Sequence, residues 1–411
     1  MKTQITISRY VILVSLALFA AGPALTQNSS ETFPEEHAQA VTPAPPIAYV
    51  YVGTAQGVFL YDTAASGQLS LVYGSPFQTT GLMAGSNGKY FVSVGTNYIH
   101  TYPVASNGAI EKQASEIDTQ NYLGAACGTN AAAGFDKTGQ SLYVLLANGG
   151  SCGALQSFQF AKNSGALTFV GSAEYNTGAN QEYWLTSAPT MTGNNKFAYA
   201  SNQIWSASNP PAIAAFVPDS TGMLQFLSIT ETDPEPPSAT PIWVGVGLSA
   251  DSVNHLAVAA FSNDDEGDVT PTQLASYTVD GSGNISSTNT YQNMPTPDVN
   301  VNSIQLSPSG QFLSVASNNI VCSGCPAEPG LQVFQFNGAK PITPLSGILT
   351  NAPIDFIAWD QANHLYAVSD STMYVYTVSG TTIAAAPGSP FLINAGPNGR
   401  DNVNALVVVP K

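Results

Sequence analysis

Charged side chains are scarce in this sequence. Only 9% of its 411 residues are Asp, Glu, Lys or Arg, whereas about 25% is usual in a soluble domain. Long surface helices need such residues on their outer face, so a helix-rich fold is disfavoured. The 36 Gly, 28 Pro, 18 Tyr and 18 Phe are instead typical of many short strands joined by tight turns. The apolar content of 44% is too high for general disorder.

Basic side chains are the scarcest of the charged ones, with 10 Lys and Arg against 26 Asp and Glu and a formal net charge of −16. Nucleic acids and anionic membranes are bound through clusters of Lys and Arg, so neither is expected as a partner. Removal of Lys2 and Arg9 with the amino-terminal segment described next takes the charge to −18 and leaves Arg400 as the single arginine.

Residues 1–27 have the pattern of a secretory signal peptide. The basic residues Lys2 and Arg9 precede an apolar run over 10–21, and Gly22–Ala24 ends that run near small residues suited to cleavage. The apolar run is shorter than the roughly 20 residues that span a membrane, so it predicts export rather than anchoring.

Residues 28–46 are acidic and Pro-rich with little to bury, and they predict a flexible linker. The folded domain is expected to cover 47–411, where no segment is long and apolar enough to span a membrane. We therefore expect a monomeric protein that is secreted or periplasmic.

The four cysteines of an exported chain favour disulfides over metal ligands. The simplest pairing joins Cys127 with Cys152 and Cys322 with Cys325. The spacing of Cys322 and Cys325 also suits half of a zinc site, but the other two cysteines lack that spacing and no histidine lies near any of the four.

The strongest signal is a repeat of roughly 52 residues that runs through the domain. In each copy the third short strand ends on an aromatic residue, at Tyr61, Tyr102, Phe160, Phe216, Tyr277, Phe336 and Tyr376. The next turn contains a glycine in each copy, at Gly67, Gly108, Gly165, Gly222, Gly283, Gly338 and Gly380. Glycine supplies the positive φ that tight hairpins require. Four short strands per copy define a propeller blade, so the seven copies predict an all-β, seven-bladed β-propeller.

The two ends of the domain predict how the ring closes. The first copy begins at the second-strand motif Tyr49–Val52, with no first strand before it, while Val403–Pro410 is an additional strand with the pattern of a first strand. An open ring would leave unpaired strand edges. We therefore predict that Val403–Pro410 completes the first blade.

Several short motifs resemble those of one propeller family. They are Tyr49–Thr54, Tyr61–Leu69, Gly74–Phe77 with its second copy Gly388–Phe391, and the turn Ser307–Gly310. Over 47–411 the sequence resembles lactonase-type seven-bladed propellers, the group of bacterial 6-phosphogluconolactonase-like and YVTN-repeat proteins. These motifs are structural turns and strands, so the resemblance implies the fold more strongly than it implies activity. The activity it implies is lactone hydrolysis, carried by Arg, His and Glu side chains at the channel.

Candidate site residues follow from where a propeller gathers its loops. Segments that enter the first strand of each blade meet at one mouth of the central channel. These segments contain Asp355–Ile357 and the candidate ligand-binding residues Tyr183, Trp184, Trp243, Asp298, Asn300 and Asn302. The candidate catalytic residues are Arg400, whose guanidinium can hold a carboxylate or phosphate bidentately, with Asp401 and Glu182. The alternative is that Asp and Asn cap turns there and that Arg400 pairs locally with Asp401.

Two further sets of polar residues have alternative interpretations. His255 and His364 occupy the same place in two copies, which predicts a structural turn position rather than a catalytic one. The acidic run Asp264, Asp265, Glu266 and Asp268 suits either a solvated hairpin tip or a Ca²⁺ ion that would relieve the repulsion between its carboxylates. No other cofactor is expected.

A propeller is a scaffold, and its fold alone does not define a function. The leading hypothesis is a binding scaffold for an extracytoplasmic protein or carbohydrate, with Trp184 and Trp243 stacking on sugar rings or buried in an interface. The alternative is a hydrolase that acts on a small lactone. A phosphorylated lactone is disfavoured, because its dianion would approach a strongly acidic protein with one arginine.

Overall fold

The domain is nearly all β, as the sequence predicts. The computed structural model describes residues 44–79, 82–122, 129–148, 152–161, 163–174, 183–185, 187–204, 212–231, 242–263, 271–290, 292–318, 329–393 and 403–411. These ranges form 30 strands and one short 3₁₀ helix, η1 (Thr119–Tyr122). No helix within them is long and apolar enough to cross a membrane.

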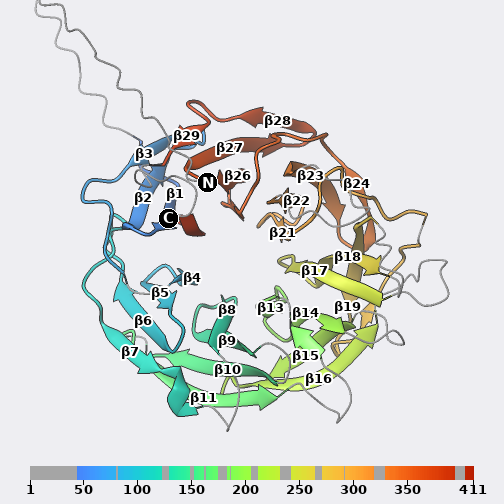
Figure 1. Cartoon of the computed structure of the whole chain (residues 1–411), viewed down its shortest axis with the longest axis horizontal. Coiled ribbons are helices and arrows are strands. Elements are labelled where there is room, and N and C mark those ends of the chain that lie inside the picture. The colour runs from blue at the N-terminus through green and yellow to red at the C-terminus, as the bar shows by residue number, and fades with distance from the viewer. Residues whose placement is uncertain are drawn as a thin grey trace, which may run out of the picture. The chain divides into compact units, whose positions relative to one another are not determined.

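Seven antiparallel blades stand in a ring, so the predicted propeller is confirmed (Figure 1). From the centre outward, blade 1 consists of β30 (Val403–Pro410), β1 (Ala48–Thr54), β2 (Gly57–Thr63) and β3 (Leu69–Leu71). Blade 2 consists of β4 (Leu82–Ser86), β5 (Tyr90–Val94), β6 (Tyr98–Pro103) and β7 (Ser115–Asp118). Blade 3 consists of β8 (Thr129–Phe135), β9 (Ser141–Asn148), β10 (Cys152–Phe160) and β11 (Leu167–Glu174).

The remaining four blades follow the same plan. In blade 4, β12 (Tyr183–Leu185) and β13 (Thr190–Met191) both pair with β14 (Ala198–Ile204), followed by β15 (Ala212–Pro218) and β16 (Leu224–Glu231). Blade 5 consists of β17 (Ile242–Ala250), β18 (His255–Asn263), β19 (Gln273–Val279) and β20 (Ile285–Ser286). Blade 6 consists of β21 (Ser303–Leu306), β22 (Phe312–Ser317), β23 (Gly330–Asn337) and β24 (Lys340–Pro344). Blade 7 consists of β25 (Phe356–Trp359), β26 (His364–Ser369), β27 (Thr372–Ser379), β28 (Thr382–Ala385) and β29 (Phe391–Leu392), which pairs with β27.

The ring closes through the last strand, as predicted. Strand β30 pairs antiparallel with β1, in a register that runs from Ala48 opposite Pro410 to Thr54 opposite Val403. The backbone N–H of Lys411 then donates to the carbonyl of Ile47 over 3.0 Å. The two ends of the domain therefore lie side by side in one blade.

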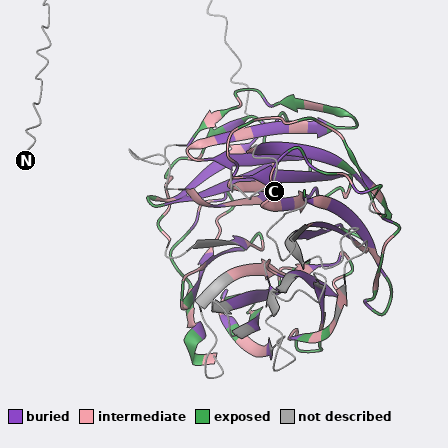
Figure 2. Ribbon diagram, turned by 45° about the vertical axis from the view of Figure 1, so that its right-hand side comes forward, coloured by how far each residue is buried: buried purple, intermediate pink, exposed green. Residues whose placement is uncertain are grey.

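The core of the domain lies in the seams between neighbouring blades. One cluster, for example, joins Val50 and Phe59 of blade 1 with Tyr366 and Val375 of blade 7. Side chains alternate between the two faces of a strand, so each blade supplies one face to each of its neighbours. All seven residues of β1 are buried for this reason. Figure 2 shows the same pattern, with buried residues along the strands and exposed ones on the outer strands and hairpins.

The repeated hairpin glycines also pack against the preceding blade. In five seams the glycine between the third and fourth strands lies against a ring at the start of the preceding blade's second strand. The pairs are Gly67 with His364, Gly108 with Tyr49, Gly165 with Tyr90, Gly283 with Phe197 and Gly338 with His255. A Cβ atom at any of these glycines would lie within 3.3 Å of the ring. The glycine repeat therefore reflects interblade packing as well as turn geometry.

Gly283→Ala is expected to lower the free energy of unfolding by about 2–4 kcal/mol. Gly283 has a φ of 88°, and a Cβ there would lie 2.7 Å from the Phe197 ring and 2.8 Å from Leu227. Gly281→Ala in the same hairpin is the matched control, because no heavy atom lies within 4 Å of its added Cβ. Urea denaturation of both variants measures the difference, and equal losses would contradict the packing role.

Candidate functional site

The turns between the first and second strands of neighbouring blades bind one another around one mouth of the ring. Asn87 Nδ2 of blade 2 donates to the carbonyl of Gly139 in blade 3 over 2.9 Å. Asn195 Oδ1 of blade 4 accepts the backbone N–H of Lys137 in blade 3 over 2.9 Å, and its Nδ2 donates to Asp136 Oδ2 over 3.1 Å. Asn195 has a φ of 59°, a left-handed conformation that such local bonds can hold.

Two close approaches continue this series of turns. Gly193 of blade 4 lies so near the carbonyl of Ser252 in blade 5 that a Cβ would overlap it. Gly310 of blade 6 lies against Asp251 of blade 5, where an added Cβ would be 3.3 Å from Asp251 Cβ. Glycine at these two positions lets the backbones approach. The turns of blades 2 to 6 are thus linked in order.

A pocket of about 760 Å³ opens beside these turns, and we call it the channel pocket. Its volume is in the range of small-molecule sites. Its described lining comes from blades 3 to 7 and consists of Lys137, Ser187, Ala188, Thr190, Gly193, Leu248, Ser249, Ala250, Asp251, Ser252, Ser303, Ile304, Gln305, Leu306, Ser307, Pro308, Asp355, Phe356, Ile357 and Gln361. More than half of these side chains are polar, and most of the polar ones are uncharged.

Two residues of strand β21 that line this pocket carry buried polar atoms without a hydrogen-bond partner among the described residues. The hydroxyl of Ser303 and Oε1 of Gln305 are withdrawn from solvent and have no hydrogen-bond partner among the described residues, and the same is true of Asn302 Oδ1. Ile304 and Leu306 pack into the core between blades 5 and 6, so Ser303 and Gln305 share the opposite face of the strand. Buried polar groups are nearly always paired. A polar ligand or water in the pocket could pair these atoms if the two side chains turned toward it.

Two Asp–His pairs hold the same turn in blades 5 and 7. His255 Nδ1 lies 2.7 Å from Asp251 Oδ2, and His364 Nδ1 lies 2.7 Å from Asp360 Oδ2. The other oxygen of each carboxylate accepts the backbone N–H of the same histidine, at 2.9 and 2.8 Å. The His255 ring also packs against Gly338 of the next blade. Both histidines thus have a structural role in the turn and the seam.

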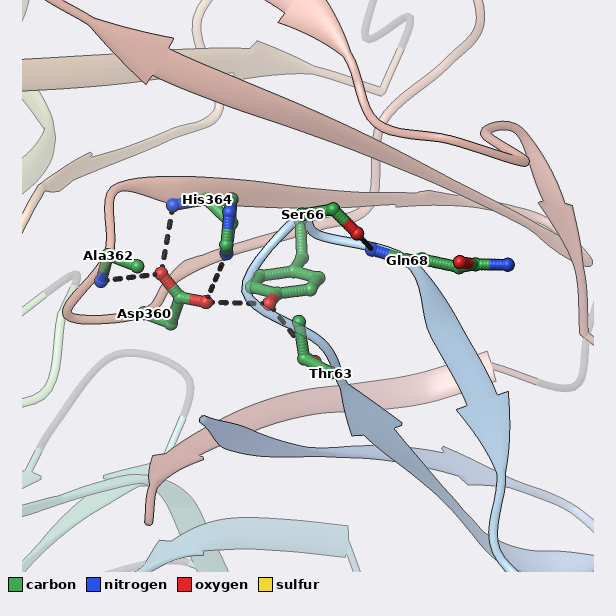
Figure 3. Close-up of polar contacts among 7 residues, drawn as sticks. Thr63, Ser66, Gln68, Asp360, Ala362 and His364 are labelled. Atoms are coloured by element: carbon green, nitrogen blue, oxygen red, sulfur yellow. Dashed lines mark hydrogen bonds and ion pairs between the residues drawn. The ribbon is translucent and has the colours of Figure 1, made fainter. Parts of the chain in front are cut away.

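The pair in blade 7 belongs to a buried network that reaches blade 1 (Figure 3). The Tyr366 hydroxyl lies 2.8 Å from Asp360 Oδ2 and 3.1 Å from Thr63 Oγ1, and so bridges the two blades. Burial alone would raise the pKa of Asp360, but the hydrogen bonds and charge of His364 outweigh it and hold that pKa below its usual value. Burial, with the charge of Asp360, raises the pKa of Tyr366, which stays a neutral phenol.

Two charged side chains of the channel pocket have shifted pKa values. Burial raises the pKa of Asp355. The backbone N–H of Asp370 donates to Asp355 Oδ2 over 3.4 Å, and this hydrogen bond acts to lower the same pKa. The Lys137 side chain is exposed and lines the pocket. Desolvation by the surrounding protein atoms lowers the pKa of Lys137, and the charge of Asp251 acts in the opposite direction.

Many of the predicted site residues lie outside the described ranges. These are Glu182, Arg400, Asp401, Asp264, Asp265, Glu266, Asp268, Cys127, Cys322 and Cys325. Their assignments to catalysis, Ca²⁺ binding and disulfides stay predictions. The structure places the backbone of Tyr183 and Trp184 in β12, of Trp243 in β17 and of Cys152 in β10. Among the described residues, no group of three or more His, Cys, Asp or Glu side chains is arranged to hold a metal ion.

The three predicted binding residues before β21 do not belong to the described lining of the pocket. Asp298 Oδ2 accepts a hydrogen bond from Gln332 Nε2 over 2.8 Å, and the backbone N–H of Asp298 donates to Gln332 Oε1 over 2.9 Å. These two bonds connect Asp298 to strand β23 of the same blade. Asn300 is partly exposed, and Asn302 directly precedes the pocket residue Ser303.

Sequence reasoning missed the pocket residues Lys137, Ser303 and Gln305, although Asp355 lies in a segment that it selected. It concentrated on the segments that enter the first strands, whereas the pocket extends along those strands to the turns that leave them. A signal was available in β21, where Ser303 and Gln305 place polar groups on one face of a strand that is apolar on the other.

No family model and no curated protein matches the sequence. Solved structures do match in fold. A protein from Lactobacillus plantarum is 15% identical, with 88% of this chain and 98% of that chain covered and a TM-score of 0.55. A putative 6-phosphogluconolactonase from Bacteroides fragilis is 10% identical, over 90% and 99% of the chains, with a TM-score of 0.57. A second protein so described, from Bacteroides uniformis, is 14% identical over 88% and 99%, with a TM-score of 0.54. The chain therefore has the fold of lactonase-like seven-bladed propellers.

Proposed function

We propose that this protein is a secreted or periplasmic binding propeller that takes up a small carbohydrate in the channel pocket. The observation that carries the proposal is the set of unpaired polar groups on β21, Ser303 Oγ and Gln305 Oε1, in a pocket of about 760 Å³. Leaving such groups buried and unpaired costs about 1–3 kcal/mol each. A hydroxyl-rich ligand would supply the missing partners once these side chains turn toward it.

The rest of the lining suits a sugar better than an apolar ligand. Ser187, Thr190, Ser252 and Gln361 add hydroxyl and amide groups. Phe356 and Ile357 provide apolar surface in the same pocket, which fits the C–H faces of a sugar ring.

A protein partner has less support in the described surface. The large apolar residues that are exposed there are scattered over five blades, at Leu71, Tyr73, Tyr98, Leu227, Val253 and Leu392. Single exposed apolar residues are common on monomeric proteins and do not define an interface.

Hydrolysis of a small lactone is the second candidate function. Asp355 lines the pocket, and burial raises its pKa, which makes its carboxylate a better base for activating water. Two of the solved structures with this fold are described as putative 6-phosphogluconolactonases. If the protein is a hydrolase, it should open δ-gluconolactone faster than buffer does, and Asp355→Asn should abolish that excess rate.

Thermal unfolding of residues 28–411 in the presence of single ligands tests the binding proposal. Neutral hexoses and their disaccharides should raise the unfolding midpoint, because a ligand at 100 times its Kd stabilises the native state by about 2.7 kcal/mol. Ca²⁺ and lactones form the comparison set. The proposal would be contradicted if no sugar raised the midpoint, or if Ca²⁺ alone did so.

Gln305→Leu separates stability from binding in the same experiment. The variant removes a buried, unpaired oxygen, so without ligand it should be as stable as the wild type or more stable by about 1 kcal/mol. It should also lose most of the shift that the sugar produces. Gln335→Leu is the matched control, because Gln335 is an exposed residue of the same blade outside the pocket. An unchanged sugar shift in Gln305→Leu would remove β21 from the site.

A further inference from the structure

Lys137 is held beside the channel pocket by its backbone. Its N–H donates to Asn195 Oδ1 over 2.9 Å, and Asn195 also binds Asp136. Asn195 has a φ of 59°, a left-handed turn conformation that asparagine readily adopts. The side chain of Lys137 is exposed and lines the pocket. The turn therefore fixes the position from which this side chain presents its charge.

The ammonium group of Lys137 makes no hydrogen bond or ion pair with the described residues, where the ion pairs all involve histidine. Asp251 is the acid whose charge acts on it, but that carboxylate is already engaged. Its Oδ1 accepts the N–H groups of Val253 and His255, each at 2.9 Å, and its Oδ2 lies 2.7 Å from His255 Nδ1. An unpaired cation in a hollow is a suitable partner for an anionic ligand group.

The charge balance of the pocket restricts which anion fits. Lys137 is the sole cation of the described lining, which also contains the acids Asp251 and Asp355. The whole chain has a formal charge of −16. A phosphate dianion would bring two negative charges to this site and a carboxylate only one, so the repulsion is weaker for the carboxylate and a single ammonium group can offset its charge.

We propose that the ligand of the channel pocket is a sugar acid of the hexuronate class. Its carboxylate binds the ammonium group of Lys137, and its ring hydroxyls bind the Ser and Gln side chains of the lining. This inference rests on the proposed function and narrows its ligand from small carbohydrates in general to those with one carboxylate.

Isothermal titration calorimetry with D-galacturonate and D-galactose at low ionic strength tests this inference, because the two sugars differ at C6 alone. A charge-assisted bond should make galacturonate bind about 10- to 100-fold more tightly. K137Q should remove this preference and K137R should keep most of it. K196Q is the matched control, since Lys196 is exposed in the next turn and does not line the pocket. Added salt should weaken the binding of galacturonate more than that of galactose.

Two results would overturn the inference while the proposed function stands. One is equal affinity for the two sugars, and the other is a preference for galacturonate that K137Q leaves intact. If neither sugar binds the folded wild-type protein, the inference fails, and if no sugar of the thermal-unfolding test shifts the midpoint either, the proposed function fails with it. The thermal unfolding midpoint of K137Q establishes that the variant is folded.

Discussion

Asp360→Ala is expected to lower the free energy of unfolding by about 3–5 kcal/mol, the usual loss when one partner of a buried charged pair is removed. Asp360 is 2% exposed, and its carboxylate binds His364 and Tyr366. Without it, two buried polar side chains lose their partner in the seam between blades 7 and 1. Urea denaturation measures the change.

Asp251→Ala is the matched control for this prediction. Asp251 holds the equivalent turn in blade 5, but the His255 side chain is 21% exposed, against 3% for His364. Water can replace the lost partner there, so the loss should be no more than about 1–2 kcal/mol. Similar losses in the two variants would contradict the role of burial and of the Tyr366 bridge.

The same network predicts a dependence of stability on pH. The pKa of Asp360 is held below its ordinary value of 3.8. A carboxyl whose pKa is lowered by folding contributes its full stability above the unfolded pKa, and that contribution is lost as pH falls through the folded pKa. Wild-type stability should therefore decline below about pH 4, and Asp360→Asn should show a shallower decline. Identical slopes would show that Asp360 does not contribute.

Deletion of Val403–Lys411 is expected to abolish cooperative unfolding. This segment contains β30, the innermost strand of blade 1, and its loss would expose the edge of β1, a strand in which every residue is buried. An unpaired apolar edge promotes association between chains. We expect a low yield of soluble protein and no sharp thermal transition by circular dichroism.

Two further chains control for the effect of shortening. A synthetic peptide of Val403–Lys411, added in trans, should restore a transition, and a scrambled peptide should not. A circular permutant that joins Lys411 to Ile47 should fold, because their backbones are already hydrogen-bonded. A truncated chain with the wild-type midpoint would contradict closure of the ring through β30.

The fold was predictable because its constraints repeat. All seven hairpin glycines have a positive φ, and in five seams a glycine such as Gly165 must also fit against a ring of the preceding blade, here Tyr90, so the same residue type returns in each copy. The position of Val403–Pro410 was predictable for a related reason, since an unpaired strand edge at both ends of the domain is costly.

The candidate site was less predictable because it depends on contacts between copies. Lys137 looks in the sequence like any polar turn residue, and it becomes distinctive because Asn195 of the next blade fixes its backbone and the engaged Asp251 leaves it unpaired. Ser303 and Gln305 become part of a pocket only together with residues of the neighbouring blades. Such relations arise from the arrangement of blades and are absent from any single repeat.

A crystal structure determined from crystals soaked in D-galacturonate most directly tests the claim that the channel pocket is the binding site. We predict sugar density in the channel pocket, with ring hydroxyls bonded to Ser303 and Gln305 and the carboxylate at Lys137. Density confined to another surface, or an empty pocket at saturating sugar, would contradict the claim that this pocket is the binding site.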